Sequence, residues 1–496
     1  MKIDTASLPD DPAKLKQLIA QMQSRYNLLE EKFRLAQQKQ FGKSSETFSG
    51  QGELFNEAED IAESVVEEEK QVSGYTRKQA KRSKLPADLP RETIVHDLAD
   101  EEKICDCCQG ELHKIGEDKA EKLKFIPAQV KVVEHIRPKY ACRACEQTGT
   151  KNNIKQAPVP ASPIPKGIAT GSLLSQIITS KYQYGLPLHR QEAMFKQYGI
   201  ELSRKTLSDW MLKSGDLFAP LLTRLKQIQV QQPNLHADET PVKVIKSDKA
   251  TSYMWVYCTG TDSPQPNNPI KNIVLYDYHN SRAALCPVDY LGTYAGYLHV
   301  DGYQAYEKTH ATLVGCWAHA RRKFIDAKKV QGTKKTGKAD MAMSFIQKLY
   351  GIESKVKGKT AAEKYNARQQ QAKPIVEKLY AWLIKQNVLA TGKLGEAITY
   401  LNNQWPKLVR YLDDGLLNID NNRAERAIKP FVIGRKNWLF SQTATGANAS
   451  AALYSIIETA KANGLIPFDY VMACLDELCK PQPDIEKLLP WNINNS

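Results

Sequence analysis

The chain lacks a long apolar segment. No run of eighteen apolar residues occurs in its 496 residues, and the N-terminal stretch MKIDTASLPDDPAKLKQ has no apolar core of the kind that a secretory signal needs. A membrane-spanning or secreted protein is therefore not expected. The sequence predicts a cytoplasmic protein, associated with the nucleoid if it binds DNA, with no membrane partner.

Acidic residues are fewer than basic ones. There are 55 Asp and Glu against 69 Lys and Arg, so the formal net charge is +14, and the isoelectric point is about 9.1. Such a balance favours an acidic partner, and nucleic acid is the usual one. Because the chain is too long for one ordinary hydrophobic core, we expect two to four domains.

Disulfides are not expected in a cytoplasmic chain, yet ten cysteines are present. Four of them form two C-x-x-C pairs, Cys105 with Cys108 and Cys142 with Cys145. This spacing predicts one closed, structural Zn²⁺ site in a small ribbon at residues 91–160, with the adjacent Cys107 as a spare ligand. The remaining cysteines are expected to be buried thiols; they are Cys258, Cys286, Cys316, Cys474 and Cys479.

Apolar residues recur every three or four positions between residues 15 and 36. This period predicts a coiled-coil helix within residues 1–48 and hence a homo-oligomer, although one amphipathic helix packed on its own domain has the same pattern. Residues 49–90 carry an acidic block and then a basic block without apolar periodicity. They are expected to form a flexible charged linker.

Residues 161–230 have a helical pattern. Two helices, PLHRQEAMFKQYG and SRKTLSDWMLKSG, are separated by IEL, and Ser203 is the expected N-cap of the second. The spacing is typical of a helix-turn-helix, although an ordinary helical hairpin is about as common. The second helix would offer four side chains to a DNA groove: Ser203, Arg204, Lys205 and Ser208.

The pattern changes to strands after residue 233. Three strand-like stretches are followed by a short helix and a fourth strand, which is the opening order of an RNase H-like fold. In that fold one carboxylate lies on the first strand and another at the end of the fourth, where Asp238 and Asp301 stand. Each ends an apolar stretch, and we expect each before a turn at the rim of the sheet.

A third carboxylate, Glu425, lies in a basic helix that begins near Asp420 or Asn421. Three carboxylates could share two Mg²⁺ (or Mn²⁺) ions, which serve phosphoryl transfer. The surrounding cations would hold the DNA backbone; they are Arg423, Arg426, Lys429, Arg435 and Lys436. The competing interpretation is a solvated helix face.

Two other acidic residues compete for these roles. Glu239 should point to the opposite face of the strand from Asp238, and Asp420 has the position of a helix N-cap.

Several long motifs resemble the large transposase of the insertion sequence 66 family. They are HADETPVKV, VDGYQAY, GCWAHARRKF, DNNRAERAIKPFVIGRKNWLF and ANGLIPFDYV, together with FGKSSE, KLPADLPRETIVHDL and the paired cysteines. The resemblance implies a DDE transposase in which Asp238, Asp301 and Glu425 are the catalytic triad. It also implies that two small accessory proteins of the same element assist transposition, and that the element's terminal inverted repeats and target DNA are the substrates.

The expected architecture is multidomain α+β. The catalytic core would occupy residues 231–330 and 413–445, interrupted by a helical insertion at 331–412 and followed by a helical region at 446–496. Cys316 and His319 resemble a C-x-x-H pair of several transposase families; two ligands do not make a zinc site, so packing or DNA orientation is expected of them. Arg321, Arg322 and Lys323 could contact phosphate.

Two further function classes fit the basic charge. One is a DNA-binding regulator or degenerate copy without activity, and the other is an architectural nucleoid protein. Neither needs three carboxylates placed for divalent metal, so the sequence favours the enzyme.

Overall fold

The structure is a computed structural model. It describes residues 11–41, 92–93, 116, 129–141, 154–261, 263, 270–330, 337–388 and 390–493. The chain separates into two compact units, Lys70–Ala157 and the combination of Met1–Glu69 with Pro158–Ser496. The residues expected to form the linker, and the paired cysteines with their predicted zinc site, lie outside the described part.

The unit Lys70–Ala157 contains two short antiparallel strands, β1 (Lys139–Tyr140) and β2 (Lys155–Gln156). Within the described stretch 129–141, only Lys139 and Tyr140 form a strand. On the N-terminal side of β1 the two segments are joined by side-chain hydrogen bonds instead of backbone pairing. Arg137 Nε donates to the Ala157 carbonyl at 2.8 Å, and Gln156 Nε2 donates to the Arg137 carbonyl at 2.8 Å.

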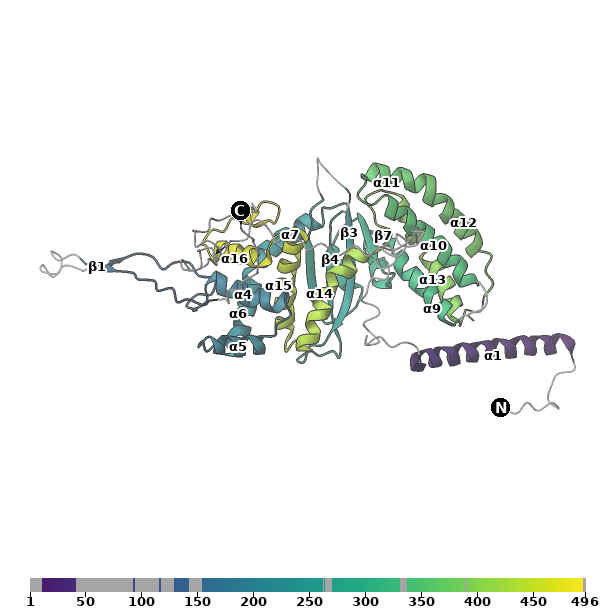
Figure 1. Cartoon of the computed structure of the whole chain (residues 1–496), viewed down its shortest axis with the longest axis horizontal. Helices are drawn as coiled ribbons and strands as arrows, with labels where there is room; N and C mark the ends of the chain where they lie inside the picture. Colours follow the sequence, from purple (N-terminus) through teal and green to yellow (C-terminus); the bar gives the residue numbers. More distant parts are fainter. Residues whose placement is uncertain are drawn as a thin grey trace, which may run out of the picture. The chain divides into compact units, whose positions relative to one another are not determined.

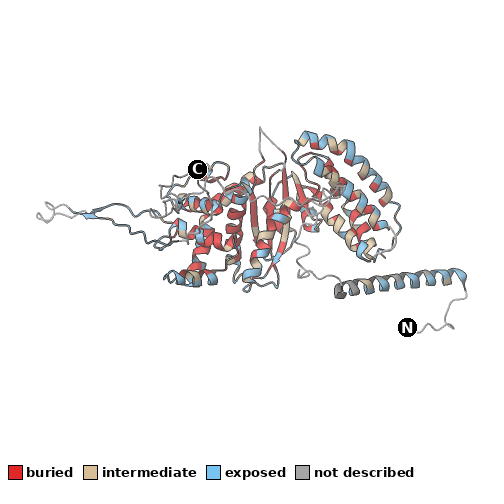
Figure 2. Ribbon diagram, viewed as in Figure 1, coloured by how far each residue is buried: buried red, intermediate tan, exposed pale blue. Residues whose placement is uncertain are grey.

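In the larger unit, helix α1 (Pro12–Phe41) carries the predicted apolar stripe. The side chains of this stripe are between 45% and 65% exposed, and most of the helix surface is open (Figures 1 and 2). They are Ile19, Met22, Tyr26, Leu29 and Phe33. The stripe is therefore available to a partner helix.

Four helices precede the sheet: α4 (Gly171–Tyr182), α5 (Leu188–Gln197), α6 (Arg204–Leu217) and α7 (Ala219–Gln229). Ser203 is the N-cap of α6, since its Oγ accepts from the Thr206 N–H at 3.1 Å; this confirms the predicted cap. Helix α6 buries Leu207, Trp210 and Met211. The residues at its start that were expected to meet DNA are exposed, namely Ser203, Arg204, Lys205 and Ser208.

A mixed five-stranded sheet forms the centre of the larger unit. Its strands are β3 (Asn234–Val242), β4 (Ser252–Cys258), β5 (Val274–His279), β6 (Tyr297–Val300) and β7 (Thr312–Gly315). The order is β5-β4-β3-β6-β7; β3, β4 and β5 pair antiparallel, whereas β6 and β7 run parallel to β3. The first four strands occur where the sequence predicts them. The four-residue β7 was not predicted, because so short a buried run has no readable period.

Helices cover this sheet and extend beyond its β7 edge. Helix α14 (Asn422–Trp438) packs on β3 and β4, and α15 (Ala444–Ala462) packs on β5 (Figure 1). The other elements are α8 (Leu285–Leu291), η3 (Gln304–Lys308), α9 (Trp317–Val330), α10 (Lys338–Lys355), α11 (Ala361–Ala367), the π-helical η4 (Arg368–Ala372), α12 (Lys373–Leu383), α13 (Lys393–Leu408), η5 (Val409–Leu412), α16 (Pro467–Leu478) and η6 (Glu486–Leu488).

Two hydrophobic cores result (Figure 2). One joins the sheet to α4–α8 and α14–α16, and the other joins α9, α10, α12 and α13 to Val314 of β7 and to Leu417 and Ile419 in the loop before α14. None of the helices in the described part of the chain combines the length and the hydropathy that a membrane span requires.

Candidate active site

The two predicted aspartates follow a short repeat, His-x-Asp, in HAD at 236–238 and HVD at 299–301. Parallel strands β3 and β6 pair in the register His236↔His299, and continuing that register by two residues would align Asp238 with Asp301. Adjacent strands are about 4.8 Å apart, and residues two positions apart share a face. All four side chains therefore lie on one face of the sheet.

The histidines confirm this alignment directly. The rings of His236 and His299 stack with centroids 4.1 Å apart and planes 9° from parallel. Both are buried, and burial lowers the pKa of His299 to about 3 and that of His236 well below its ordinary value. The two histidines are thus neutral, and each lies two residues before an aspartate on the same face of the sheet.

Asp238 lies inside β3 rather than at its end, which corrects the expectation of a turn. It pairs with Val256 of β4, and β3 continues to Val242. Pairing with β6 stops at His236, because β6 ends at Val300. Asp238 is therefore at the rim on the β6 side only, which leaves its side chain open to a ligand while its backbone stays in the sheet.

Asp301 is held by two different elements. Its Oδ1 accepts from the Tyr303 N–H at 2.8 Å, and its carbonyl accepts from the Tyr400 hydroxyl of α13 at 2.8 Å. The next residue, Gly302, has a φ of 100°, and a Cβ there would lie 3.1 Å from the Gln404 amide carbon. The helical insertion therefore fixes the turn that carries the second carboxylate.

Asn421 places α14 over this face. Its Nδ2 donates to the Ala237 carbonyl at 2.8 Å, and its Oδ1 lies 3.1 Å from Nδ1 of His236. Asn421 is also the N-cap of α14, which begins at Asn422. Glu425 comes one turn later, so the anchor on β3 brings the third carboxylate to the aspartates.

The electrostatics show that the three carboxylates influence one another. Burial, and then repulsion from Glu239, Asp301 and Glu425, raise the pKa of Asp238 well above its ordinary value. Burial raises the pKa of Glu425 to about 7, against the opposing effect of the Arg322 charge. Burial and mutual repulsion thus disfavour the charged form of these carboxylates, as expected of groups that receive a cation.

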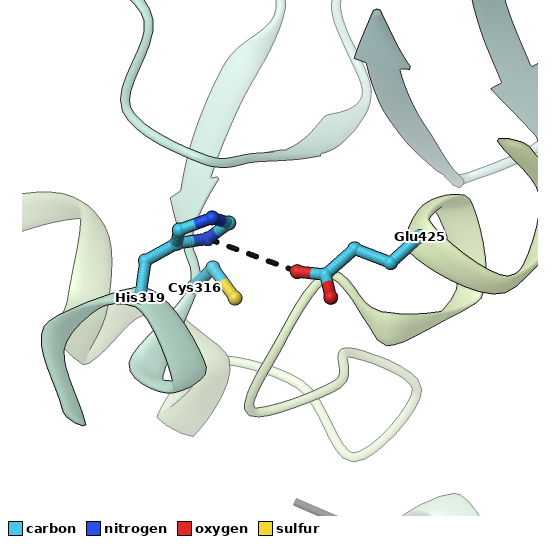
Figure 3. A group of neighbouring side chains, drawn as sticks. All are labelled: Cys316, His319 and Glu425. Atoms are coloured by element: carbon cyan, nitrogen blue, oxygen red, sulfur yellow. Dashed lines mark ion pairs between the residues drawn. The ribbon is translucent and has the colours of Figure 1, made fainter. Parts of the chain in front are cut away.

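Glu425 also faces Cys316 and His319, at the start of α9 (Figure 3). One ligand atom from each residue lies within 4.8 Å of the other two, and this is the one such trio of metal-ligating side chains in the described residues. Nδ1 of His319 is 3.8 Å from Oε1 of Glu425, too far for a hydrogen bond. Burial lowers the pKa of His319 to about 4, so this contact is not an ion pair at neutral pH.

Glu239 occupies the opposite face and is fully engaged there. Its side chain is 2% exposed; Oε1 accepts from Arg282 Nε at 3.0 Å, and Oε2 accepts from the Tyr306 hydroxyl at 2.7 Å. These bonds stabilise the carboxylate within the fold and leave it little capacity for a metal ion.

Asp420 is likewise satisfied by protein groups. Its Oδ1 accepts from the Asn422 N–H at 3.2 Å, and its Oδ2 accepts from the Tyr350 hydroxyl at 3.1 Å. The residue thus caps the start of α14 from one position before the N-cap, and burial raises its pKa to about 6.

The basic residues of the predicted DNA surface divide into two groups. Arg426 and Lys436 are exposed. By contrast Arg435 donates to Thr240 Oγ1 at 3.0 Å and so ties α14 to β3. Arg423 approaches Gly260 so closely that a Cβ there would lie 2.5 Å from its Nη1. On α9, Arg321 and Arg322 are half-buried and Lys323 is exposed.

A cavity of about 460 Å³ lies beside Glu425. Basic residues Arg426, Lys429 and Lys461 line it together with Tyr182 and Tyr184. Positive charge and aromatic rings next to a carboxylate are the surroundings that a nucleic-acid chain would need to reach a metal site.

Three features of the site were not predicted from the sequence. The repeated His-x-Asp spacing was a readable sign of the stacked histidines, because alternation on a strand puts His and Asp on one face. The approach of Glu425 to Cys316 and His319 had no local sign. Nor did Asn421, whose anchoring role depends on a contact between residues 185 positions apart.

Comparison with known proteins places these residues in a wider group. The family described as Transposase IS66 family matches residues 166–449, which include all three carboxylates. A zinc-finger binding domain of transposase IS66 matches 102–146 and spans the four paired cysteines; Transposase C of IS166 homeodomain matches 28–94, and the IS66 C-terminal element matches 455–491. No solved structure matches the chain.

Similar full-length proteins occur in Sinorhizobium fredii. Uncharacterized protein y4jD is 35% identical over 82% of this chain and 81% of its own length. Uncharacterized protein y4qI is 32% identical over 88% and 83%, and Uncharacterized protein y4hP is 31% identical over 85% and 78%. A family match over more than half of the chain, together with relatives of this extent, shows that the chain belongs to the IS66 transposase family, whose DDE domain implies phosphoryl transfer on DNA.

Proposed function

We propose that this chain binds the ends of its insertion element and catalyses metal-dependent DNA cleavage and strand transfer through Asp238, Asp301 and Glu425. The observation that carries the proposal is the register of β3 and β6, which aligns the histidines two positions before the two aspartates; the repulsion that Asp301 and Glu425 exert on Asp238 supports it, and α14, anchored at its start, carries Glu425. An inactive DNA-binding protein would have no need of this arrangement.

The architecture supports the same conclusion. Five strands in the order β5-β4-β3-β6-β7, with the first three antiparallel and the last two parallel to β3, have the arrangement of an RNase H-like core. The carboxylates lie on its first strand, at the end of its fourth strand and on a later helix. We infer that residues 231–330 and 413–445 form this core around the helical insertion.

The three carboxylates fit hard divalent cations. Carboxylate oxygens are the ligands that Mg²⁺ and Mn²⁺ prefer, and Oε1 of Glu425 is buried without a hydrogen-bond partner. Two ions shared among the carboxylates would not require all three ligands to converge on one point. A pair of ions can therefore use all three carboxylates although they do not form a trio within 4.8 Å among the described residues.

The chain's own residues would position the metal ligands and the DNA backbone for the reaction. When bound, two Mg²⁺ ions supply activation of the attacking hydroxyl or water and stabilisation of the leaving oxygen. Asp238, fixed in the sheet, and Asp301, fixed by Tyr400, set the positions of the oxygen ligands. Exposed Arg426, with Lys429 in the cavity wall, would hold the phosphate backbone next to Glu425.

The test of this function is strand transfer of a pre-cut element end by the purified chain. Product should form with Mg²⁺ or Mn²⁺ and be absent when divalent ions are omitted. Activity should also depend on pH, because Glu425 has a pKa raised to about 7 and must lose its proton to bind a metal.

The sign of this pH effect follows from the raised pKa. Below about pH 7 the neutral carboxyl dominates, so the Mg²⁺ concentration for half-maximal rate should rise by roughly tenfold per pH unit. Above pH 8 it should become constant. An Mg²⁺ requirement that is the same at pH 6 and pH 8 would contradict the assignment of Glu425.

DNA binding should be electrostatic and should involve the start of α6. Arg204→Ala or Lys205→Ala should each lower the affinity for element ends and reduce the slope of log affinity against log salt by about 1. Asp209→Asn, an exposed change on the same helix, serves as the matched control and should not weaken binding. Unchanged affinity of both basic variants at every salt concentration would exclude α6 as the recognition helix.

Self-association is expected through α1. Deleting residues 15–36 should lower the mass seen by light scattering, because their apolar stripe is exposed in the single chain. Leu29→Glu should act in the same direction, whereas Lys32→Glu, on the exposed polar surface, should not. An unchanged mass in the deletion would place the interface elsewhere. The two accessory proteins of the element remain proposed partners.

A further inference from the structure

We propose that Cys316, His319 and Glu425 form a second metal site, suited to Zn²⁺, and that an ion bound there withdraws Glu425 from the Mg²⁺ centre. The first part concerns binding alone. The second part rests on the proposed function.

The geometry suits a small, thiolate-accepting ion. Three atoms that are at most 4.8 Å apart share a central point that lies within about 2.8 Å of each, and zinc bonds to S, N and O are about 2.0–2.3 Å long. The 3.8 Å between His319 Nδ1 and Glu425 Oε1 exceeds by only a few tenths the spacing of about 3.4 Å between two ligand atoms of a tetrahedral ion. Small side-chain rotations would close the site.

Two of the three ligand atoms are without hydrogen-bond partners in the protein. His319 Nδ1 and Glu425 Oε1 are both buried and unpaired. In Figure 3 the imidazole and the carboxylate point toward each other, with the Cys316 sulfur beside them. Buried polar atoms of this kind normally have a partner, so their convergence on one point indicates a missing ligand rather than simple packing.

A backbone hydrogen bond would orient the sulfur once a metal ion binds it. The Asn421 N–H donates to Cys316 Sγ at 3.2 Å, so the sulfur has the kind of outer-shell hydrogen bond that orients metal ligands. The same residue anchors α14 on β3. Cys316 and Glu425 are therefore held by one short segment, which fixes the separation of two of the three ligands.

Glu425 stands between two donor sets of opposite preference. On one side are the oxygen donors Asp238 and Asp301, which select Mg²⁺; on the other are a thiolate and an imidazole, which select Zn²⁺. A carboxylate that completes the sulfur and nitrogen set cannot complete the oxygen set in the same geometry. Zinc should thus lower activity at concentrations far below those of Mg²⁺, and should do so through Cys316.

Binding is tested with Co²⁺ on the full chain after its four-cysteine site has been filled with Zn²⁺. One further equivalent of Co²⁺ should produce a thiolate-to-cobalt charge-transfer band, which the oxygen ligands of the Mg²⁺ centre cannot give. The band should disappear in Cys316→Ser and weaken in His319→Ala and Glu425→Gln. Cys479→Ser, at the half-exposed end of α16, is the matched control and should keep it. Absence of the band in the unmodified chain overturns the site.

Competition is tested by the ratio of strand-transfer rates with and without micromolar Zn²⁺ at fixed Mg²⁺. The ratio should fall at least tenfold for the unmodified chain and for Cys479→Ser, and should stay near one for Cys316→Ser. Zinc stimulation, or equal inhibition in Cys316→Ser, overturns the competition. A chain that shows the cobalt band but no strand transfer under any condition would refute the proposed function while leaving the metal site intact.

Discussion

Replacing Glu425 by Gln should lower strand transfer by at least about 10³-fold, since losing a metal ligand removes several kcal/mol of transition-state stabilisation and each 1.36 kcal/mol is tenfold in rate. Asp238→Asn and Asp301→Asn should have the same effect. Affinity for DNA should remain within about twofold, because binding depends on the cations and not on the carboxylates.

The melting temperature of Glu425→Gln distinguishes a loss of catalysis from a loss of folding. Burial raises the pKa of Glu425 to about 7, so at pH 8 the fold holds an ionised carboxylate in a place that disfavours charge. An amide relieves this cost. The melting temperature of Glu425→Gln should therefore be equal to or higher than that of the unmodified chain, whereas a merely structural carboxylate would lose stability.

The controls come from the two acidic residues that the fold already satisfies. Asp420→Asn and Glu239→Gln should keep much more activity than Glu425→Gln, because Asp420 caps α14 and Glu239 is bound by Arg282 and Tyr306. Glu239→Gln is expected to lose stability, since it leaves a half-exposed arginine without its ion pair. Full activity in Glu425→Gln, or complete loss only in Asp420→Asn, would move the third ligand to another residue.

Changing either cysteine pair should release one Zn²⁺ per chain and unfold its ribbon. Structural zinc contributes about 10–16 kcal/mol to the folding of small zinc domains. Cys105→Ser with Cys108→Ser, or Cys142→Ser with Cys145→Ser, should therefore abolish bound zinc in elemental analysis and make residues 91–160 sensitive to protease. The family match to a zinc-finger binding domain at 102–146 supports this assignment.

Cys107 provides the control for the zinc ligands. Cys107→Ser should retain zinc if this residue is a spare, and equal loss of zinc would show that it replaces Cys105 or Cys108. The core should melt at an unchanged temperature in the paired variants, because the ribbon belongs to a separate unit. Freshly purified, unoxidised protein without zinc would overturn the site. The three-ligand site at Cys316 has fewer thiolates and should be empty unless zinc is added.

The sequence by itself predicted four of the five strands of the central sheet and named Asp238, Asp301 and Glu425 as candidate carboxylates. Strand alternation and apolar runs are local properties, and they predicted β3, β4, β5 and β6 where they occur. The basic helix pointed to Glu425, the family resemblance implied the same residue, and in the fold Asp420 is bonded to Asn422 and Tyr350. The cap at Ser203 was also predictable, because capping depends on residues three positions apart.

Only the tertiary structure decided how these elements meet. The segment between β7 and α14 begins and ends at one place, because the Trp317 N–H donates to the Ile419 carbonyl at 3.2 Å. The 124 positions between Asp301 and Glu425 in the sequence therefore do not separate the two residues widely in the fold. The same closure brings Cys316 and His319 to Glu425. Such contacts depend on packing between distant segments, which no local period encodes; the sequence could name the side chains, but the register of β3 with β6 and the anchoring of Asn421 set which of them face one another.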